Sequence, residues 1–276
     1  MALSKKSLWR GFAATAAVLL ATTLSACSSG SIAGDTVTEG KLTIGTGNPA
    51  YSPWVIDDAP ESGNGFEAAV AYAVAEKLGF KSEDVVWIRT TFDEAIAPGA
   101  KNFDFNLQQY SITEERKANI DFSTPYYETA QVVVTVASSP AASAKSIADL
   151  KGYLIGAATG TTSFSSIAKV INPSQSALAF NSNDDAKAAL TNGQVDAIVL
   201  DLPTALYASC CELDGGTIIG QLPTADKGDQ FGLVLDKGSK LTAAVSKAID
   251  ELRADGTLAK LEEKWLTADA GVPVLK

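Results

Sequence analysis

The stretch Ser111-Ile112-Thr113-Glu114-Glu115-Arg116, followed by Asp121-Phe122-Ser123-Thr124-Pro125-Tyr126-Tyr127, separates two similar sets of predicted strands and helices. On both sides of it, short apolar runs alternate with patterns of helical period, which is typical of α/β units built around parallel sheets. Thr113 is placed to cap a short helix that contains Arg116. Ligands of such sheets bind beyond the carboxyl ends of the strands. We therefore expect an α/β protein with two lobes, each a mostly parallel sheet flanked by helices, and a ligand cleft between them.

Regular elements precede and follow this stretch. Val70, Val74 and Leu78 fall on one stripe of a helix that stops at Gly79. A second helix is expected to begin at Asn183 and end at Gly193. Strands are predicted over 42–45, 85–88, 103–107, 131–137, 153–157, 195–200 and 231–235. The helix that stops at Gly79 is predicted over 66–78, and a short helix over 92–96.

The first residues have the layout of an export signal. Lys5, Lys6 and Arg10 precede an apolar run that is too short to span a bilayer as a permanent helix. The run ends in Leu24-Ser25-Ala26-Cys27, which resembles the lipobox of bacterial lipoproteins. We expect residues 1–26 to be a signal peptide and Cys27 to carry lipid with acyl chains such as palmitate, since two or more chains hold a protein at a membrane stably. The alternative is a plain cleaved signal with an incidental cysteine.

Residues 27–40 are rich in Ser, Gly and Thr and are predicted to be a flexible tether. The ordered chain is expected to begin near Lys41, at the extracytoplasmic face of the cell membrane. There is no second long apolar run, so we expect the mature part not to cross the membrane.

Composition limits the possible functions. The 276-residue chain has a net charge of −10, and removal of the signal makes this about −13, which argues against nucleic acid as a partner. The chain has no His, the commonest general base and metal ligand, and lacks the usual metal-ligand and phosphate-loop spacings. We expect a monomeric binding protein with no catalytic residue, no metal and no cofactor.

Cys210 and Cys211 are neighbours in an oxidising compartment. Three arrangements are open: a vicinal disulfide, pairing between chains, or two reduced cysteines that act as small buried hydrophobes.

Two loops at predicted strand ends in the first lobe carry candidate ligand contacts. Tyr51 and Trp54 offer flat apolar faces and Asn48 an amide, although aromatic residues in such a loop also serve simple packing. The second loop contains Gln109, Tyr110, Ser111 and Arg116. A guanidinium can bind a carboxylate through two parallel hydrogen bonds. The alternative for Arg116 is a surface ion pair with Glu114 or Glu115.

Two further candidates follow predicted strands in the second lobe. The turn from Thr159 to Ser163, which includes Thr161 and Thr162, has free N–H groups at a helix start that suit an anion, with ordinary capping as the alternative. Asp201 lies at the end of another strand, and its alternative role is that of a helix N-cap.

Seven short motifs between Lys41 and Leu266 occur in a fixed order. They are 46–54, 65–67, 111–116 with 121–127, 149–152, 160–162, 193–197 and 253–257. In this order they resemble the amino-acid-binding cluster of ABC-transporter extracellular solute-binding proteins, which have the type II periplasmic-binding-protein fold. The resemblance implies that the chain crosses between the lobes twice, with hinges near Glu128–Gln131 and Leu222–Gln230. It implies lobe 1 over 41–129 plus 229–276, and lobe 2 over 130–228.

The resemblance also implies roles at the ligand. Arg116 corresponds to the family's carboxylate-binding arginine, with help from Ser111 and from backbone donors at Thr161 and Thr162. Asp201 corresponds to the aspartate that binds the ammonium group.

Other implied contacts concern the ligand's side chain. Tyr51 matches the aromatic residue that covers it, Phe92 a second aromatic residue, and Asn48 a position that tunes the choice of side chain.

Four departures from the family leave open which amino acid is bound. Gln109 stands where the family usually has Gly, so that its side chain either narrows the pocket or adds an amide contact. Asn48 is neutral where binders of cationic side chains often carry Asp, and Ala158 and Leu200 stand where some relatives have basic residues.

The implied function is that of a substrate-binding lipoprotein of an ABC importer. It would capture an amino acid or similar zwitterion by hinge closure and deliver it to a membrane permease. The alternatives are a ligand-sensing co-receptor and a dehydratase-like enzyme with pocket carboxylates as acid and base.

Overall fold

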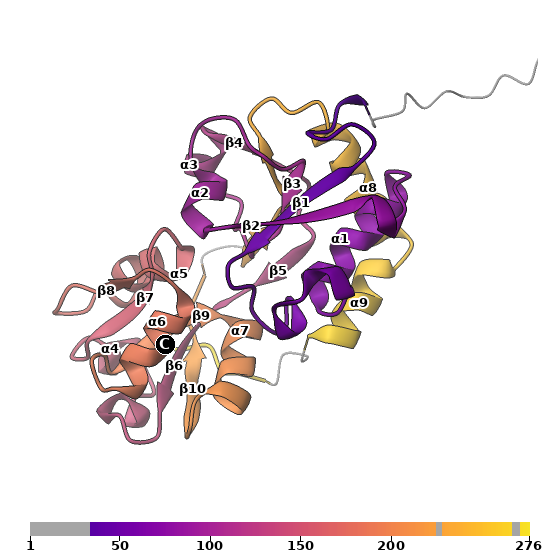
Figure 1. The fold of residues 1–276 in the computed structure, drawn as a ribbon. Coiled ribbons are helices and arrows are strands. Elements are labelled where there is room, and N and C mark those ends of the chain that lie inside the picture. Colours follow the sequence, from indigo (N-terminus) through magenta and orange to yellow (C-terminus); the bar gives the residue numbers. More distant parts are fainter. Residues whose placement is uncertain (1–33, 225–227, 267–270) are drawn as a thin grey trace, which may run out of the picture. The chain divides into compact units, whose positions relative to one another are not determined.

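The computed structural model describes residues 34–224, 228–266 and 271–276 (Figure 1). The predicted signal peptide over 1–26 and the predicted lipidation of Cys27 lie outside these residues, as does most of the predicted tether. Between residues 34 and 276, the chain forms two five-stranded sheets and one two-stranded ribbon.

The first sheet has the strand order β2-β1-β3-β12-β4. Its strands are β1 (Leu42–Gly47), β2 (Val85–Thr90), β3 (Phe105–Asn106), β4 (Ile120–Phe122) and β12 (Val234–Asp236). The helices of this part are α1 (Phe66–Lys77), α2 (Phe92–Ile96), α3 (Glu114–Lys117), α8 (Thr242–Ala254) and α9 (Thr257–Trp265). Strand β1 pairs in parallel with β2 and β3, whereas β12 is antiparallel to β3 and β4.

The second sheet has the strand order β10-β6-β9-β7-β8. Its strands are β6 (Gln131–Val136), β7 (Ile155–Ala158), β8 (Leu178–Phe180), β9 (Ala197–Asp201) and β10 (Gly216–Gln221), and its helices are α4 (Ile147–Leu150), α5 (Thr162–Ser166), α6 (Asn183–Thr191) and α7 (Leu202–Tyr207). Strand β7 pairs in parallel with β8 and β9, whereas β6 is antiparallel to β9 and β10. The prediction of two α/β lobes with mostly parallel sheets is confirmed. In each sheet a single strand, β12 in the first and β6 in the second, runs against the other four.

The two connections between the sheets lie side by side as an antiparallel ribbon. It consists of β5 (Tyr127–Thr129) and β11 (Asp229–Phe231), in which Glu128 faces Gln230. Both strands fall within or beside the predicted hinge ranges, of which residues 225–227 lie outside the described part of the chain. The exact lobe boundaries stay a prediction.

One part of the domain prediction is wrong. Residues 271–276 were expected in the first lobe with the rest of the C-terminal segment. Instead, the amide of Leu275 donates to the carbonyl of Gln221 at the end of β10, at 2.9 Å, and the carbonyl of Lys276 accepts from Ile147. The Leu275 side chain is buried with Ile219 and Leu222, so burial of this leucine holds the chain end on the second sheet.

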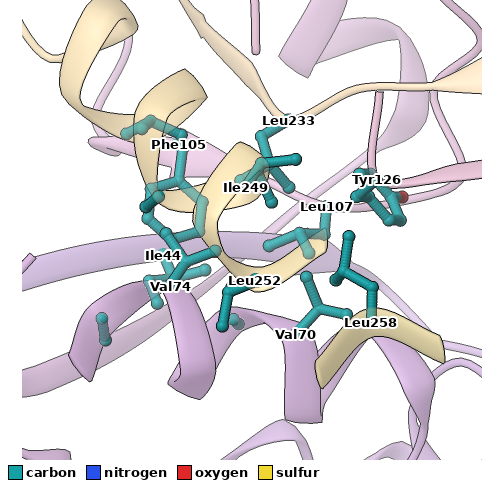
Figure 2. Packing of buried hydrophobic residues seen from close by; sticks show 14 of the residues in the cluster. Ile44, Val70, Val74, Phe105, Leu107, Tyr126, Leu233, Ile249, Leu252 and Leu258 are labelled. Carbon is teal, nitrogen blue, oxygen red and sulfur yellow. The ribbon is translucent and has the colours of Figure 1, made fainter. Parts of the chain in front are cut away.

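Each sheet has a hydrophobic core of its own. In the first, side chains of α1, α8 and α9 share one buried cluster with those of β1 and β3. Figure 2 shows Val74 beside Ile44, and Leu258 beside Val70. In the second, one cluster contains Val133 and Ile155 and another contains Val134 and Ile198. Because Val133 and Val134 are adjacent on β6 and point to opposite faces, both faces of the second sheet are covered.

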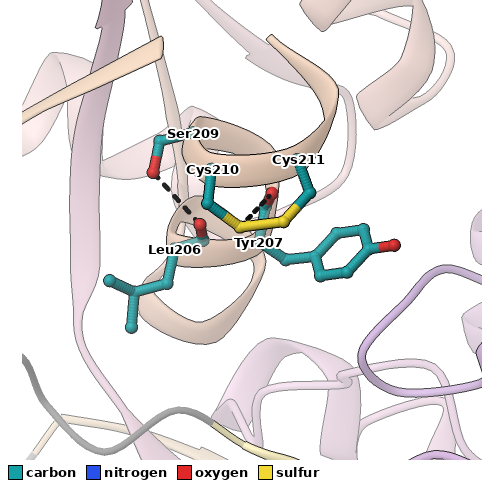
Figure 3. Close-up of a disulfide and its surroundings, with 5 residues drawn as sticks. All are labelled: Leu206, Tyr207, Ser209, Cys210 and Cys211. Carbon is teal, nitrogen blue, oxygen red and sulfur yellow. Dashed lines mark hydrogen bonds between the residues drawn. A yellow bond between two sulfur atoms is a disulfide. The ribbon is translucent and has the colours of Figure 1, made fainter.

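Cys210 and Cys211 form a vicinal disulfide (Figure 3). It lies in the helical turn Ala208–Glu212 that continues α7, where the Cys210 sulfur is 3.4 Å from the carbonyl oxygen of Tyr207.

Candidate ligand-binding site

A cavity of about 130 Å³ is lined by residues that come from both sheets. The first sheet contributes the loops after β1, β2 and β3, together with α3. The second contributes the turn after β7, the start of α6 and the end of β9. Nine of the eleven predicted ligand contacts line this cavity: Asn48, Tyr51, Phe92, Gln109, Ser111, Arg116, Thr161, Thr162 and Asp201.

Arg116 is buried in the first-sheet wall of the cavity, with 8% of its surface exposed. Its Nη1 donates to the carbonyl of Ser111 at 2.6 Å, and its Nη2 donates across the cavity to the carbonyl of Gly160 at 2.8 Å. The guanidinium carbon lies 5.2 Å from the centre of the Phe92 ring, at a distance that allows a cation–π contact. Burial lowers the pKa of Arg116 below its ordinary value.

No carboxylate of the described residues forms a salt bridge with Arg116. Glu114 pairs instead with Lys117, at 2.8 Å. The alternative of a surface ion pair with Glu114 or Glu115 is therefore wrong for the described chain. A buried guanidinium that has only carbonyl partners keeps its affinity for an incoming carboxylate.

Asp201 lies on the second-sheet side of the cavity, where β9 ends and α7 begins. Its backbone is at the N-cap position, but its side chain makes no capping hydrogen bond. Oδ1 accepts a hydrogen bond from Nε2 of Gln131 at 2.7 Å. Burial, together with the nearby charge of Asp229, raises the pKa of Asp201 to about 8. The alternative of an N-cap side chain is therefore wrong.

A polar network that the sequence did not reveal connects this aspartate to the ribbon and to the first sheet. Nε2 of Gln131 also donates to Oδ2 of Asp229 at 2.8 Å, and Oγ of Ser163 donates to Oε1 of Gln131 at 2.6 Å. Oγ of Ser111 contacts both Oδ2 of Asp229, at 3.2 Å, and Oγ1 of Thr162, at 3.1 Å. Gln131 and Asp229 fall inside the predicted hinge ranges, but no sequence motif pointed to their side chains.

The turn before α5 gives the second sheet a further polar edge at the cavity. Oγ1 of Thr161 accepts from the amide of Phe164 at 3.0 Å, so this side chain has the capping role that was the alternative to anion binding. The first N–H groups of a helix have no intrahelical acceptor.

Tyr51 lines the cavity and lies against α6. Nζ of Lys187, from the second sheet's side, lies 5.4 Å from the centre of the Tyr51 ring. Lys187 is held there by Asp184, at 2.9 Å, and Glu212, at 2.6 Å. Burial raises the pKa of Tyr51, and the negative charge of Asp184 adds to this effect.

Two predicted contacts are wrong, because large aromatic rings gain most by complete burial. Trp54 is fully buried against Phe66, and its Nε1 donates to Oγ1 of Thr204 at 2.9 Å. Tyr110 is also fully buried, with its ring 4.6 Å from that of Phe92. Neither residue lines the cavity.

Gln109, the residue that stands in place of Gly, has a left-handed backbone with φ of 52°. Its amide N–H and Nε2 donate to the carboxylate of Glu67, at 2.8 and 2.5 Å, and Tyr126 donates to the same carboxylate. Glu67 is 1% exposed, and its burial raises its pKa to about 7. The Gln109 amide group is therefore bound to Glu67 rather than directed at the ligand.

Among the helices of the described residues, none combines the length and the apolar character that crossing a membrane requires.

Known proteins resemble this chain over nearly all of its described length. Residues 42–268 match the bacterial extracellular solute-binding proteins, family 3. The L-arginine-binding protein of Pseudomonas aeruginosa is 29% identical over 228 residues, which are 80% of this chain and 86% of that protein. The L-cystine-binding protein TcyJ of Escherichia coli is 30% identical over 235 residues, 83% of this chain and 84% of that protein.

A solved structure of an ancestral arginine-binding protein bound to glutamine superimposes with a TM-score of 0.69 at 35% identity, and it covers 83% of this chain and 98% of that one. The relatives share the fold and differ in the ligand that their names give. The type II periplasmic-binding-protein fold follows from this likeness and from the two mixed sheets. The chain belongs to the bacterial extracellular solute-binding proteins, family 3.

Proposed function

We propose that this protein binds one α-amino acid in the cavity between its two sheets. One observation carries the proposal: Arg116 and Asp201, 85 positions apart along the chain and attached to different sheets, line the same cavity, and neither forms a salt bridge within the described residues. A zwitterion has the two charges that these side chains need. Its carboxylate would bind Arg116 and the nearby hydroxyl of Ser111, and its ammonium group would bind Asp201.

Closure of the two lobes around the ligand follows from the same arrangement. An isolated buried charge costs several kcal/mol, so a ligand that neutralises both charges stabilises the closed form. The contacts that already cross the cavity, from Arg116 to Gly160 and from Ser111 to Thr162, would form only when the lobes close. The β5–β11 ribbon would serve as the hinge.

In the cell, the protein would act as the receptor of an ABC importer and present its closed form to a membrane permease. We propose that it does so as a monomer, anchored outside the cytoplasm by lipid on Cys27 after removal of residues 1–26. Family membership and the motif at Leu24–Cys27 support this part of the proposal.

We also propose that the protein does not alter its ligand. The rival on the same fold is a dehydratase, for which Asp201 with its raised pKa would be the acid. NMR of candidate amino acids incubated with the protein separates the two functions, since an enzyme yields new resonances and a receptor does not. A sensor would be distinguished by unchanged amino-acid uptake in a deletion strain.

Calorimetry with a panel of amino acids tests the binding proposal. The wild-type protein should bind at least one of them, and Arg116→Ala should abolish that binding. Unchanged affinity in this variant would refute the role of Arg116.

A further inference from the structure

Gln108 lines the cavity together with the predicted ligand contacts of the first sheet, and its side-chain amide is hydrogen-bonded at its oxygen end. The hydroxyl of Tyr110 donates to Oε1 of Gln108 at 2.9 Å. Tyr110 itself is fully buried and packed on Phe92, so the hydroxyl cannot move without disturbing the core. Tyr110 thus acts behind the cavity wall, through Gln108.

The other end of this amide is unoccupied. Nε2 of Gln108 carries two N–H donors, and neither has a hydrogen-bond acceptor among the described residues. In this orientation Tyr110 binds the oxygen end of the amide, and the group that Gln108 presents at the cavity is its NH₂, which donates hydrogen bonds. A ligand that satisfies it must bring an acceptor oxygen to this place.

The charges around the cavity exclude one class of such ligands. The charged residues of its lining are Asp93, Arg116 and Asp201. Once Arg116 holds the α-carboxylate, no second cation of the lining remains to pair with an acidic side chain. Aspartate and glutamate are therefore disfavoured despite their acceptor oxygens.

The donor end of Gln108 also disfavours basic ligands. Guanidinium and ammonium groups carry donors only, so an arginine or lysine side chain would place donors against the donors of Gln108. Asp93, the other acidic residue of the lining, lies beside Gly160. A Cβ atom added to Gly160 would be 2.5 Å from Oδ1 of Asp93. Its carboxylate therefore sits with Arg116 and Phe92, at the end of the cavity assigned to the α-carboxylate.

We propose that Gln108 is a specificity-determining residue that donates to a side-chain carbonyl oxygen, and that the ligand is an amino acid with a carboxamide side chain. A carboxamide offers this oxygen together with two N–H donors. Asn48 and Asn181, which line the same cavity, carry amide oxygens that can accept them. This inference rests on the proposed function and narrows its ligand to one chemical class.

Calorimetry of the wild-type protein with glutamine, asparagine, glutamate, arginine, lysine and norleucine is the first test. Glutamine or asparagine should bind most tightly. Norleucine, which has an apolar side chain of similar length, should bind about ten- to a hundredfold more weakly, because it leaves the Gln108 donors without an acceptor. If no amino acid binds, the proposed function fails. If arginine, lysine, glutamate or norleucine binds best, the proposed function stands and the present inference is overturned.

The second test is Gln108→Glu, which keeps the oxygen that accepts from Tyr110 and replaces the NH₂ group by an acceptor. Affinity for the carboxamide ligand should fall about ten- to a hundredfold, and affinity for arginine or lysine should rise. Gln194→Glu is the matched control, since it makes the same chemical change at an exposed position outside the cavity and should leave affinities unchanged. Carboxamide affinity within twofold of wild type in folded Gln108→Glu protein would overturn the inference. If this variant fails to fold, the wild-type ligand ranking alone decides it.

Discussion

The carboxylates of Asp201 and Asp229 share a single amide nitrogen: Nε2 of Gln131 donates to Oδ1 of the first at 2.7 Å and to Oδ2 of the second at 2.8 Å. Burial raises the pKa of Asp201 to about 8, and the nearby negative charge of Asp229 adds to this effect.

The first prediction is that amino-acid binding releases a proton near neutral pH. An ammonium group beside Asp201 requires the ionised carboxylate, and at pH 7 a group with a pKa of about 8 is mostly protonated. Binding should release about one proton per ligand, and affinity should fall about tenfold for each pH unit below 8. Calorimetry at pH 7 in buffers of different ionisation enthalpy measures the released protons. A heat of binding that does not depend on the buffer would contradict this assignment.

The same group makes the ligand-free protein less stable as pH rises. The pKa of Asp201 in the folded protein exceeds the ordinary value of 3.8, so the folded state binds more protons than the unfolded state between these values. Asp201 therefore contributes most to the free energy of unfolding below pH 3.8, where it is protonated in both states. This stabilising contribution is lost as pH rises through about 8. Asp201→Asn removes this dependence and serves as the control for the proton-release experiment.

The second prediction separates the roles of the two charged side chains. Asp201→Asn should weaken binding of amino acids much more than binding of the corresponding carboxylic acids without an amino group, because only the former place an ammonium group at this position. Loss of a hydrogen bond to a charged partner is worth about 1.5–3 kcal/mol, or roughly ten- to a hundredfold in affinity. Titration of both ligand series against wild type and variant measures the difference, and equal losses in the two series would show that Asp201 does not bind the ammonium group.

The sequence predicted the two lobes and most of the cavity wall because both depend on local patterns. Arg116, for example, sits in a capped turn after a strand, and its position there is fixed by its neighbours. The strands β4, β5, β8 and β10 were not predicted. The first three have only three residues each, too few for a hydrophobic period to show.

Contacts between distant segments could not be predicted. The loop that contains Trp54 gave no sign that its indole would reach Thr204, 150 positions along the chain, instead of the ligand. Gln131 and Asp229 come together only because β5 and β11 pair, and that pairing depends on the whole fold.

The third prediction concerns Gln109, whose left-handed backbone lowers the free energy of unfolding, whereas its hydrogen bond to Glu67 raises it. A non-glycine residue in this conformation costs about 1–2 kcal/mol, whereas a buried acceptor left without its donor costs about 1–3 kcal/mol. Gln109→Ala loses the side-chain bond to Glu67 and keeps the backbone cost, while Gln109→Gly loses the bond and removes that cost. The Ala variant should therefore be less stable than the Gly variant, by about 1–2 kcal/mol in urea unfolding.

Gln194 provides the matched pair for this comparison, since it is exposed and its φ is not positive. There the order should reverse, with Gln194→Gly less stable than Gln194→Ala, because glycine loses more conformational freedom on folding. If Gln109→Gly is no more stable than Gln109→Ala, the left-handed backbone carries no cost at this site. In that case the hydrogen bond from Nε2 of Gln109 to Glu67 would have no backbone cost to offset at this position.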